Sequence, residues 1–355
     1  MSKETMQALV LHAVGDLRLE RVPRPTPGPG EALVRVVACG VCGSDVPRVF
    51  EHGTYSFPLI PGHEFAGVVV DAPESSEVRA GARVAVKPLI PCGTCPFCAI
   101  GALAQCRSYD YVGSRRDGAF AEYVAVPAAN LVPVPEGVSL EAAALTEPAA
   151  VALHAVRQGG VEPGDRVAVL GAGPIGMLVA QWARIWGAGQ VFLADIDSSK
   201  LALVEELGLG RPVDSRVEDP VSRVRQETGG LGPDLVVEAA GVPATLVQAL
   251  WLARPLGRVV IMGNPAADVT LPRDAISQIL RKELTIRGTW NSHMVALPVD
   301  EWTVALEMMA QGRLRIKPLI SHRVSLARGV QALNMMRDRS EPYNRVIFIN
   351  AREEA

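Results

Sequence analysis

Short apolar runs separated by turn residues dominate the first third of the chain. Between Glu31 and Pro127 these runs are ALVRVV, FAGVVV, RVAVKPLI and AEYVAVP, and Gly, Pro and Asp interrupt them. Short runs with frequent turn signals are typical of strands connected by tight turns. The pattern therefore predicts an irregular, mostly antiparallel β domain.

After Glu141 the pattern changes to strands that alternate with helices. An Ala-rich helical stretch, EAAALTEPAAVALHAVRQGG, precedes the strand-like runs RVAVLG, QVFLAD, DLVVEAAG, GRVVIMG and KELTIRG. Between these runs lie helical segments from Pro174 to about Trp186, SSKLALVEELG and ATLVQALWLARP. Strands separated by helices of about ten to fifteen residues predict a doubly wound parallel sheet with helices on both faces.

The end of the chain does not continue this alternation. After Trp290 one further helical stretch, EWTVALEMMAQG, precedes the strand-like segments PLISHRV and NRVIFIN. This tail is too short for a domain of its own, so we expect it to return to the first domain. The sequence thus predicts an α/β protein in which residues 1–155 and 297–355 form one domain and residues 156–296 the other.

The composition supports two packed domains and excludes several classes of protein. The chain has 355 residues, of which 48% are hydrophobic, and one hydrophobic core rarely serves more than about 300 residues. A net charge of -3 supplies no basic field for nucleic acid or an anionic membrane. No apolar run reaches the roughly 18 residues of a membrane span. The first residues lack the apolar core of a signal peptide, so we expect a cytoplasmic protein.

The first chemical motif is GAGPIG, which follows the apolar run VAVL and opens a helix. It comprises Gly171, Gly173, Pro174, Ile175 and Gly176. Glycines here permit a tight turn and the close approach of a pyrophosphate to the helix N-terminus. Asp195 ends the next strand, where its carboxylate can bind the adenosine ribose hydroxyls and would repel a ribose phosphate. Because only Lys200 offers a nearby cation, we expect NAD rather than NADP; the alternative is a glycine-rich turn in another α/β protein.

The second motif is a run of four closely spaced cysteines. They are Cys92, Cys95, Cys98 and Cys106. Four thiolates at such spacings can surround one Zn²⁺ tetrahedrally, and they leave no open position, so this site would be structural. An iron–sulfur cluster is the main alternative, whereas a disulfide framework is not expected in a reducing compartment.

The third candidate combines Cys42, His63 and a carboxylate from Glu64 or Glu147. A thiolate, an imidazole and a carboxylate can hold Zn²⁺ and leave a position for water or a substrate oxygen, as catalytic zinc sites do. Each residue alone is more often structural. The interpretation therefore depends on their combination with a dinucleotide motif.

Together these motifs resemble the zinc-dependent medium-chain dehydrogenase/reductase family over essentially the whole chain. GVCGSD, PGHEFAG, the four-cysteine segment, TEP and GAGPIG occur in that family's order and spacing. The resemblance implies a GroES-like substrate domain, a Rossmann cofactor domain, two zinc ions per chain and a homodimer or homotetramer. It implies Cys42 and His63 as catalytic zinc ligands, with Glu64 or Glu147 completing the set. Asp45 would orient His63, and Cys39 would not be a ligand.

Within that family, several stretches are similar to the polyol dehydrogenases. They are CGSDVPRVF, YDYVGSRRDGAFAEY, RKELTIRGTW and PLISHRV, together with the glutamate of TEP. The expected reaction is oxidation of a secondary hydroxyl of a sugar alcohol or sugar-alcohol phosphate to the ketose. Pro47 stands where alcohol dehydrogenases carry a relay histidine, so the proton would leave through Ser44, Glu147 or water. The alternatives are an unphosphorylated polyol or threonine as substrate, zinc-free enone reduction, and a catalytically silent nucleotide-binding protein.

A phosphorylated substrate would require a cation near the reacting group. Arg48, Arg115 and Arg116 are the candidates, because guanidinium binds phosphate oxygens bidentately. Arginine is also the usual cation of this chain, so an ordinary salt bridge is the alternative for each. The other histidines, which show no ligand spacing, are His12, His52, His154, His293 and His322. Trp290 and His293 are interpreted as cleft residues or, equally, as core or interface residues.

Overall fold

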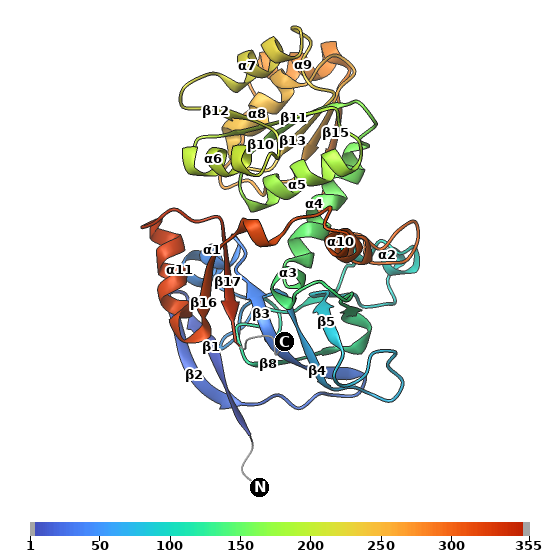
Figure 1. Ribbon diagram of the computed structural model, residues 1–355, viewed down its shortest axis with the longest axis vertical. Helices are drawn as coiled ribbons and strands as arrows, with labels where there is room; N and C mark the ends of the chain where they lie inside the picture. Colours follow the sequence, from blue (N-terminus) through green and yellow to red (C-terminus); the bar gives the residue numbers. More distant parts are fainter. Residues whose placement is uncertain (1–3, 351–355) are drawn as a thin grey trace. The chain divides into compact units, whose positions relative to one another are not determined.

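The computed structural model describes residues 4–350 and divides the chain into two compact units (Figure 1). The first unit runs to Glu147 and resumes at His293, and the second comprises Pro148–Ser292. The division therefore falls within helix α4 (Thr146–Gly159). The C-terminal tail belongs to the first unit, while the exact domain boundaries given above stay a prediction.

A mostly antiparallel sheet forms the centre of the first unit. Its strands lie in the order β16-β17-β3-β4-β5-β9, and β8 pairs with β3. Their bounds are β3 (Glu31–Gly40), β4 (Glu64–Asp71), β5 (Arg83–Val86), β8 (Tyr123–Pro127), β9 (Leu131–Pro133), β16 (Ile320–Ser325) and β17 (Arg345–Ile349). β16 and β17 pair in parallel, and β17 then pairs antiparallel with β3, which attaches the tail to the sheet.

Smaller elements surround this sheet. β1 (Thr5–Ala13) and β2 (Asp16–Pro23) form an antiparallel hairpin that the sequence reading did not identify. The run RVAVKPLI is divided between β5 and β6 (Leu89–Ile90), which pairs instead with β7 (Asp110–Tyr111). Pro88 separates the two strands, since proline cannot donate to a ladder. The α-helices of this unit include α1 (Asp45–Pro47), α2 (Pro96–Ala99), α3 (Leu140–Ala143), α10 (Glu301–Ala310) and α11 (Gly329–Asp338).

The second unit has the predicted doubly wound parallel sheet, in the order β12-β11-β10-β13-β14-β15. The strands are β10 (Arg166–Leu170), β11 (Gln190–Asp195), β12 (Arg211–Asp214), β13 (Leu235–Glu238), β14 (Arg258–Ile261) and β15 (Thr285–Gly288). Helices α5 (Pro174–Ile185) and α6 (Ser198–Glu206) cover one face, and α7 (Pro220–Glu227), α8 (Pro243–Leu252) and α9 (Arg273–Lys282) cover the other (Figure 1). The strand order reverses between β10 and β13, where folds of this kind bind ligands.

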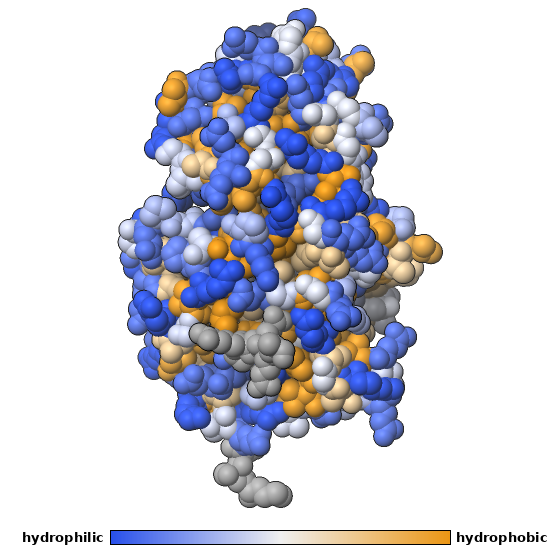
Figure 2. Space-filling model, in the orientation of Figure 1, coloured by the Kyte–Doolittle hydropathy of each residue, from blue (hydrophilic) through white to orange (hydrophobic). Residues whose placement is uncertain are grey.

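Apolar residues lie mainly inside each unit. Central strands such as β10 and β13 are buried along almost their whole length, as parallel strands covered on both faces must be. Hydrophilic residues cover much of the face drawn in Figure 2. Within residues 4–350, no helix combines the length and apolarity needed to cross a bilayer.

Candidate metal and dinucleotide sites

Three potential metal ligands converge in the first unit. Cys42 lies just after β3, His63 directly precedes β4, and Glu64 is the first residue of that strand. Their ligand atoms all lie within 4.8 Å of one another. The antiparallel register explains this, because Gly40 at the end of β3 pairs with Glu64.

Asp45 fixes the surroundings of His63. Its buried carboxylate accepts the Cys42 N–H at 2.9 Å and an Arg48 N–H at 2.5 Å, and its Oδ1 lies 3.5 Å from His63 Nδ1. Burial is the largest single influence and works against both charges, but the attraction between Asp45 and His63 and the hydrogen bonds to their neighbours together outweigh it. They hold the pKa of Asp45 below and that of His63 well above the ordinary values. Asp45 is therefore ionised and positioned to orient the imidazole.

Arg345 on β17 supports Glu64 from a distant part of the chain. Its Nη1 donates to the Val41 carbonyl at 2.9 Å and to Glu64 Oε1 at 3.2 Å. Both charged side chains are buried, so each compensates the charge of the other. Glu64 Oε2 lies 3.1 Å from the same Arg345 nitrogen as an ion-pair contact but accepts no hydrogen bond.

Glu147 lies beside this group, near the start of α4. Burial raises its pKa to about 7, against the attraction of His63. The Tyr111 hydroxyl donates to Glu147 Oε1 at 3.4 Å, and the Tyr111 ring meets the His63 ring edge-on, with the centroids 5.8 Å apart. Burial, together with the charge of Glu147, raises the pKa of Tyr111 well above its usual value, so the phenol is a neutral donor. Sequence reasoning did not identify Tyr111 or Arg345 as site residues.

The donor set of this group fits zinc. Thiolate, imidazole and carboxylate are zinc ligands, and the buried Glu64 Oε2 is left without a hydrogen bond. Ser44 is exposed, and its N–H donates to Cys42 Sγ at 3.5 Å. Cys39 differs: it is fully buried, its thiol donates to the Gly40 carbonyl, and burial raises its pKa well above the ordinary value. Cys39 is therefore a neutral thiol.

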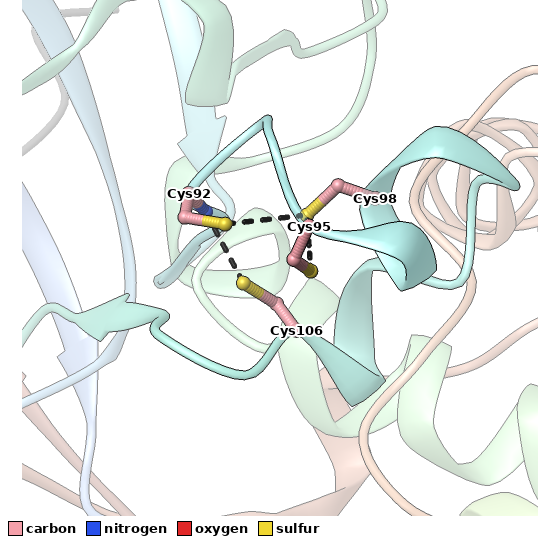
Figure 3. A group of neighbouring side chains, drawn as sticks. All are labelled: Cys92, Cys95, Cys98 and Cys106. Atoms are coloured by element: carbon pink, nitrogen blue, oxygen red, sulfur yellow. Dashed lines mark hydrogen bonds between the residues drawn. The ribbon is translucent and has the colours of Figure 1, made fainter.

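The four closely spaced cysteines also come together, around α2 (Figure 3). Cys98 Sγ lies 3.9 Å from Cys92 Sγ and 3.5 Å from Cys95 Sγ, and Cys106 Sγ accepts the Cys92 N–H at 3.2 Å. The Thr94 N–H and the Cys106 thiol lower the pKa of Cys92 to about 6, whereas burial raises that of Cys98 to about 12. Four sulfurs so close together form a donor set that a soft divalent cation such as Zn²⁺ fits.

The glycines of GAGPIG form a tight turn between β10 and α5. Gly171 has φ +106°, and a Cβ there would meet the Ala240 backbone nitrogen at 2.9 Å. A Cβ on Gly176 would lie 1.9 Å from the Gly171 carbonyl oxygen, so helix and turn pack too closely for any side chain. Gly173 precedes the helix and Pro174 begins it, followed by Ile175. The free N–H groups of this helix end are suited to bind phosphate.

Asp195, the last residue of β11, is held against that turn. Its Oδ2 accepts the Ala172 N–H at 2.7 Å and its Oδ1 accepts the Asp197 N–H at 2.9 Å. A carboxylate has about four acceptor positions, so two remain for ribose hydroxyls. Lys200 Nζ lies 3.9 Å from Asp197 Oδ2, so its charge is already partly compensated.

The three arginines proposed for phosphate have different surroundings. Arg48 is paired with the buried Asp45. Arg116 is paired with Glu31 at 2.6 Å and lies 3.8 Å from Asp110. The guanidinium carbon of Arg115 instead lies 4.0 Å from the Tyr55 ring centroid and 4.5 Å from that of Tyr109.

The remaining histidines lie away from these groups. Among residues 4–350, two groups of side chains could hold a metal ion, the four cysteines and the Cys42 group. Neither contains a histidine other than His63. The partners are Glu20 for His12, Glu51 for His52, Gln158 for His154, the Val299 carbonyl for His293 and Ser321 for His322. Trp290, just after β15, is 57% exposed and thus not a core residue.

Comparison with known proteins agrees with this arrangement. The family model described as "Alcohol dehydrogenase GroES-like domain" matches residues 28–136, and the one described as "Zinc-binding dehydrogenase" matches residues 174–311. Galactitol 1-phosphate 5-dehydrogenase of Escherichia coli (strain K12) is 37% identical over 311 residues, which cover 85% of this chain and 88% of the relative. Sorbitol dehydrogenase of Homo sapiens is 33% identical over 340 residues, or 93% and 92% of the two chains.

Solved structures show the same likeness. The crystal structure of galactitol-1-phosphate dehydrogenase from Escherichia coli superposes with a TM-score of 0.91 at 34% identity, covering 97% of this chain and 100% of that one. A putative zinc-binding dehydrogenase from Sinorhizobium meliloti 1021, bound to NADP, gives a TM-score of 0.88 at 34% identity and covers 98% and 99%. At 34% sequence identity, both structures share more with this chain than the fold alone.

Proposed function

Because this chain belongs to the zinc-dependent medium-chain dehydrogenase/reductase family, whose members include oxidoreductases acting on CH–OH groups, we propose that it is a polyol dehydrogenase. It oxidises a secondary hydroxyl of a sugar alcohol or sugar-alcohol phosphate to the ketose, with NAD⁺ as the hydride acceptor, as a galactitol-1-phosphate 5-dehydrogenase does. The convergence of Cys42, His63 and Glu64 within 4.8 Å carries this proposal. The two similar polyol dehydrogenases support the substrate class.

We assign two zinc ions to each chain. Cys42, His63 and Glu64 would hold the catalytic ion, with Glu147 as the alternative carboxylate. The four cysteines, which lie in the segment matched by the alcohol dehydrogenase GroES-like model, would hold the structural ion, and membership of a zinc-dependent family supports zinc over an iron–sulfur cluster. The catalytic zinc would polarise the substrate hydroxyl, and the nicotinamide of bound NAD⁺ would accept the hydride.

Side chains of this protein preorganise the catalytic site before the substrate binds. The ion pair with Asp45 would orient the imidazole ring of His63, and the ion pair with Arg345 would orient the carboxylate of Glu64. The Tyr111 hydroxyl holds Glu147 Oε1. Positions fixed in this way reduce the reorganisation needed for catalysis.

Proton release requires a route that avoids Pro47, which has no titratable group. Ser44 is exposed immediately beside Cys42, so its hydroxyl is the first candidate to accept the substrate proton. Glu147 or water is the next carrier. Asp195 supports NAD⁺ as the coenzyme, since its carboxylate is fixed at the end of β11 and the nearby Lys200 is paired with Asp197.

Two further expectations accompany the proposal. We also infer a cytoplasmic location, a reducing compartment in which the thiols needed to bind zinc are kept reduced. All four residues of β15, at the edge of its sheet, are exposed, which supports a homodimer or homotetramer with a small-molecule substrate.

Initial rates with a panel of alcohols test the proposed function. The panel contains galactitol 1-phosphate, galactitol, sorbitol, xylitol and threonine. Each compound is assayed with NAD⁺ and with NADP⁺. We expect the highest kcat/KM with a polyol or polyol phosphate and NAD⁺. A sorbitol-type enzyme is the second candidate, favoured by the human relative, and higher kcat/KM with sorbitol than with galactitol 1-phosphate would select it. Activity with threonine alone, or none with any alcohol, would refute the proposal.

A further inference from the structure

We propose that Arg115, whose guanidinium contacts the rings of Tyr55 and Tyr109, is the residue that binds the phosphate group of a phosphorylated polyol. This inference rests on the proposed function and specifies the substrate class of the same site. It singles out one of three arginines, and the argument depends on their partners.

Two aromatic rings contact the Arg115 guanidinium. Its guanidinium carbon lies 4.0 Å from the Tyr55 ring centroid and 4.5 Å from the Tyr109 ring centroid. These are distances of cation–π contact, which fix the plane of a guanidinium while leaving its N–H groups free to donate. A guanidinium so oriented can offer two parallel N–H groups to phosphate oxygens.

The charge of Arg115 has no carboxylate partner among residues 4–350. By contrast, Arg48 pairs with Asp45, and Arg116 pairs with Glu31. A phosphate approaching either of these arginines would have to compete with an existing carboxylate. Arg115 presents an uncompensated positive charge, which favours an anionic ligand.

Arg115 is connected to the proposed catalytic group through aromatic contacts. The rings of Tyr109 and Tyr111 meet edge-on with their centroids 6.3 Å apart, and the Tyr111 ring meets His63 at 5.8 Å. The same Tyr111 hydroxyl contacts Glu147. One short segment, from Tyr109 to Arg115, thus extends from the candidate zinc ligands to the stacked guanidinium.

Solvent exposure fits the charged end of a substrate. Tyr55 is 71% exposed, whereas His63 is 4% exposed. A phosphate group keeps part of its hydration at an exposed position, while the hydroxyl that reacts lies at the buried end. We therefore expect the polyol chain to extend from His63 toward Arg115.

The test compares Arg115→Gln with the matched control Arg116→Gln, which removes the neighbouring charge. The measured quantity is the ratio of kcat/KM for galactitol 1-phosphate to kcat/KM for galactitol, both with NAD⁺. We expect the ratio to fall about tenfold to hundredfold in Arg115→Gln, as for the loss of one charge-assisted contact. Arg116→Gln should keep the wild-type ratio. Tyr55→Leu, which removes one exposed ring, should lower the ratio several-fold.

Inorganic phosphate supplies a second readout. It should inhibit galactitol 1-phosphate oxidation competitively in the wild type and in Arg116→Gln, and much more weakly in Arg115→Gln. An unchanged ratio in Arg115→Gln, or a wild type that prefers galactitol, would overturn this inference and leave the polyol dehydrogenase proposal intact. Oxidation of neither compound by the wild type would instead overturn the proposed function.

Discussion

The two candidate metal groups of the first unit are built in different ways. The four cysteines lie within residues 92–106, and backbone N–H groups of the same segment surround them. The Cys42 group joins the end of β3 to the start of β4, and its supporting residues come from α1, β7, α4 and β17. One site is thus encoded in a short segment, while the other is assembled by the whole fold.

The two sites should therefore differ in whether they keep their structure without the metal. Asp45 and Arg345 hold His63 and Glu64 through charges that are present before any ion binds. The four cysteines instead contact one another and backbone groups of their own segment; Cys98, for example, contacts Cys92 and Cys95. We therefore expect the assembled site to govern activity and the local site to govern the stability of its own segment.

Replacing Cys42 should have the largest effect on the assembled site. We expect Cys42→Ala to lower kcat by about a thousandfold or more, since loss of the metal removes several kcal/mol of charge stabilisation. Zinc analysis should show the loss of about one ion per chain. Cys39→Ala is the matched control, because Cys39 is buried nearby but is not in the group. If both variants lost activity equally, the distinction between the two cysteines would be wrong.

Substitution of Arg345 tests whether its ion pair with Glu64 stabilises the site. Arg345→Met leaves Glu64 buried without its counter-charge, so we expect the free energy of unfolding to fall by about 3 kcal/mol or more. Denaturant titration measures this change. Arg345→Lys keeps the charge and should recover part of the stability. Wild-type stability in Arg345→Met would mean that the ion pair does not hold the site together.

The dinucleotide turn is a third site, and like the cysteine segment it is encoded locally. Asp195→Ala should lower kcat/KM with NAD⁺ about tenfold to hundredfold, because two ribose hydroxyls lose a charged acceptor. Activity with NADP⁺ should change little or rise, since the repulsion of the ribose phosphate is removed. An equal loss with both coenzymes would assign Asp195 to holding the turn through Ala172 alone.

The sequence could predict what neighbouring residues determine. The cysteine spacing, the GAGPIG turn and the alternation of strands and helices all depend on short segments, and the doubly wound sheet is confirmed. The contacts that organise the Cys42 group join residues far apart, such as Arg345 with Glu64, 281 positions away, and Tyr111 with Glu147, 36 positions away. No spacing rule connects such pairs. Only the fold brings them together.

The same limit applies to the arginines. Their sequence positions made Arg48, Arg115 and Arg116 equal candidates for phosphate. The partners that distinguish them are Asp45, the two tyrosine rings and Glu31, and these partners depend on how loops meet in space. The β1–β2 hairpin was likewise not identified, because the charged and apolar residues of β2 resemble those of an exposed segment.

Timed removal of zinc can distinguish the two metal sites of the first unit. The purified enzyme is incubated with a chelator while zinc content, polyol oxidation and thermal unfolding are followed together. We predict two zinc ions per chain at the start. Activity should disappear with the first ion while the unfolding temperature is nearly unchanged, and the second ion should leave later, with a fall in that temperature. Full activity with a single zinc per chain, or loss of both ions in one step together with unfolding, would show that the protein does not have one zinc for activity and another for stability.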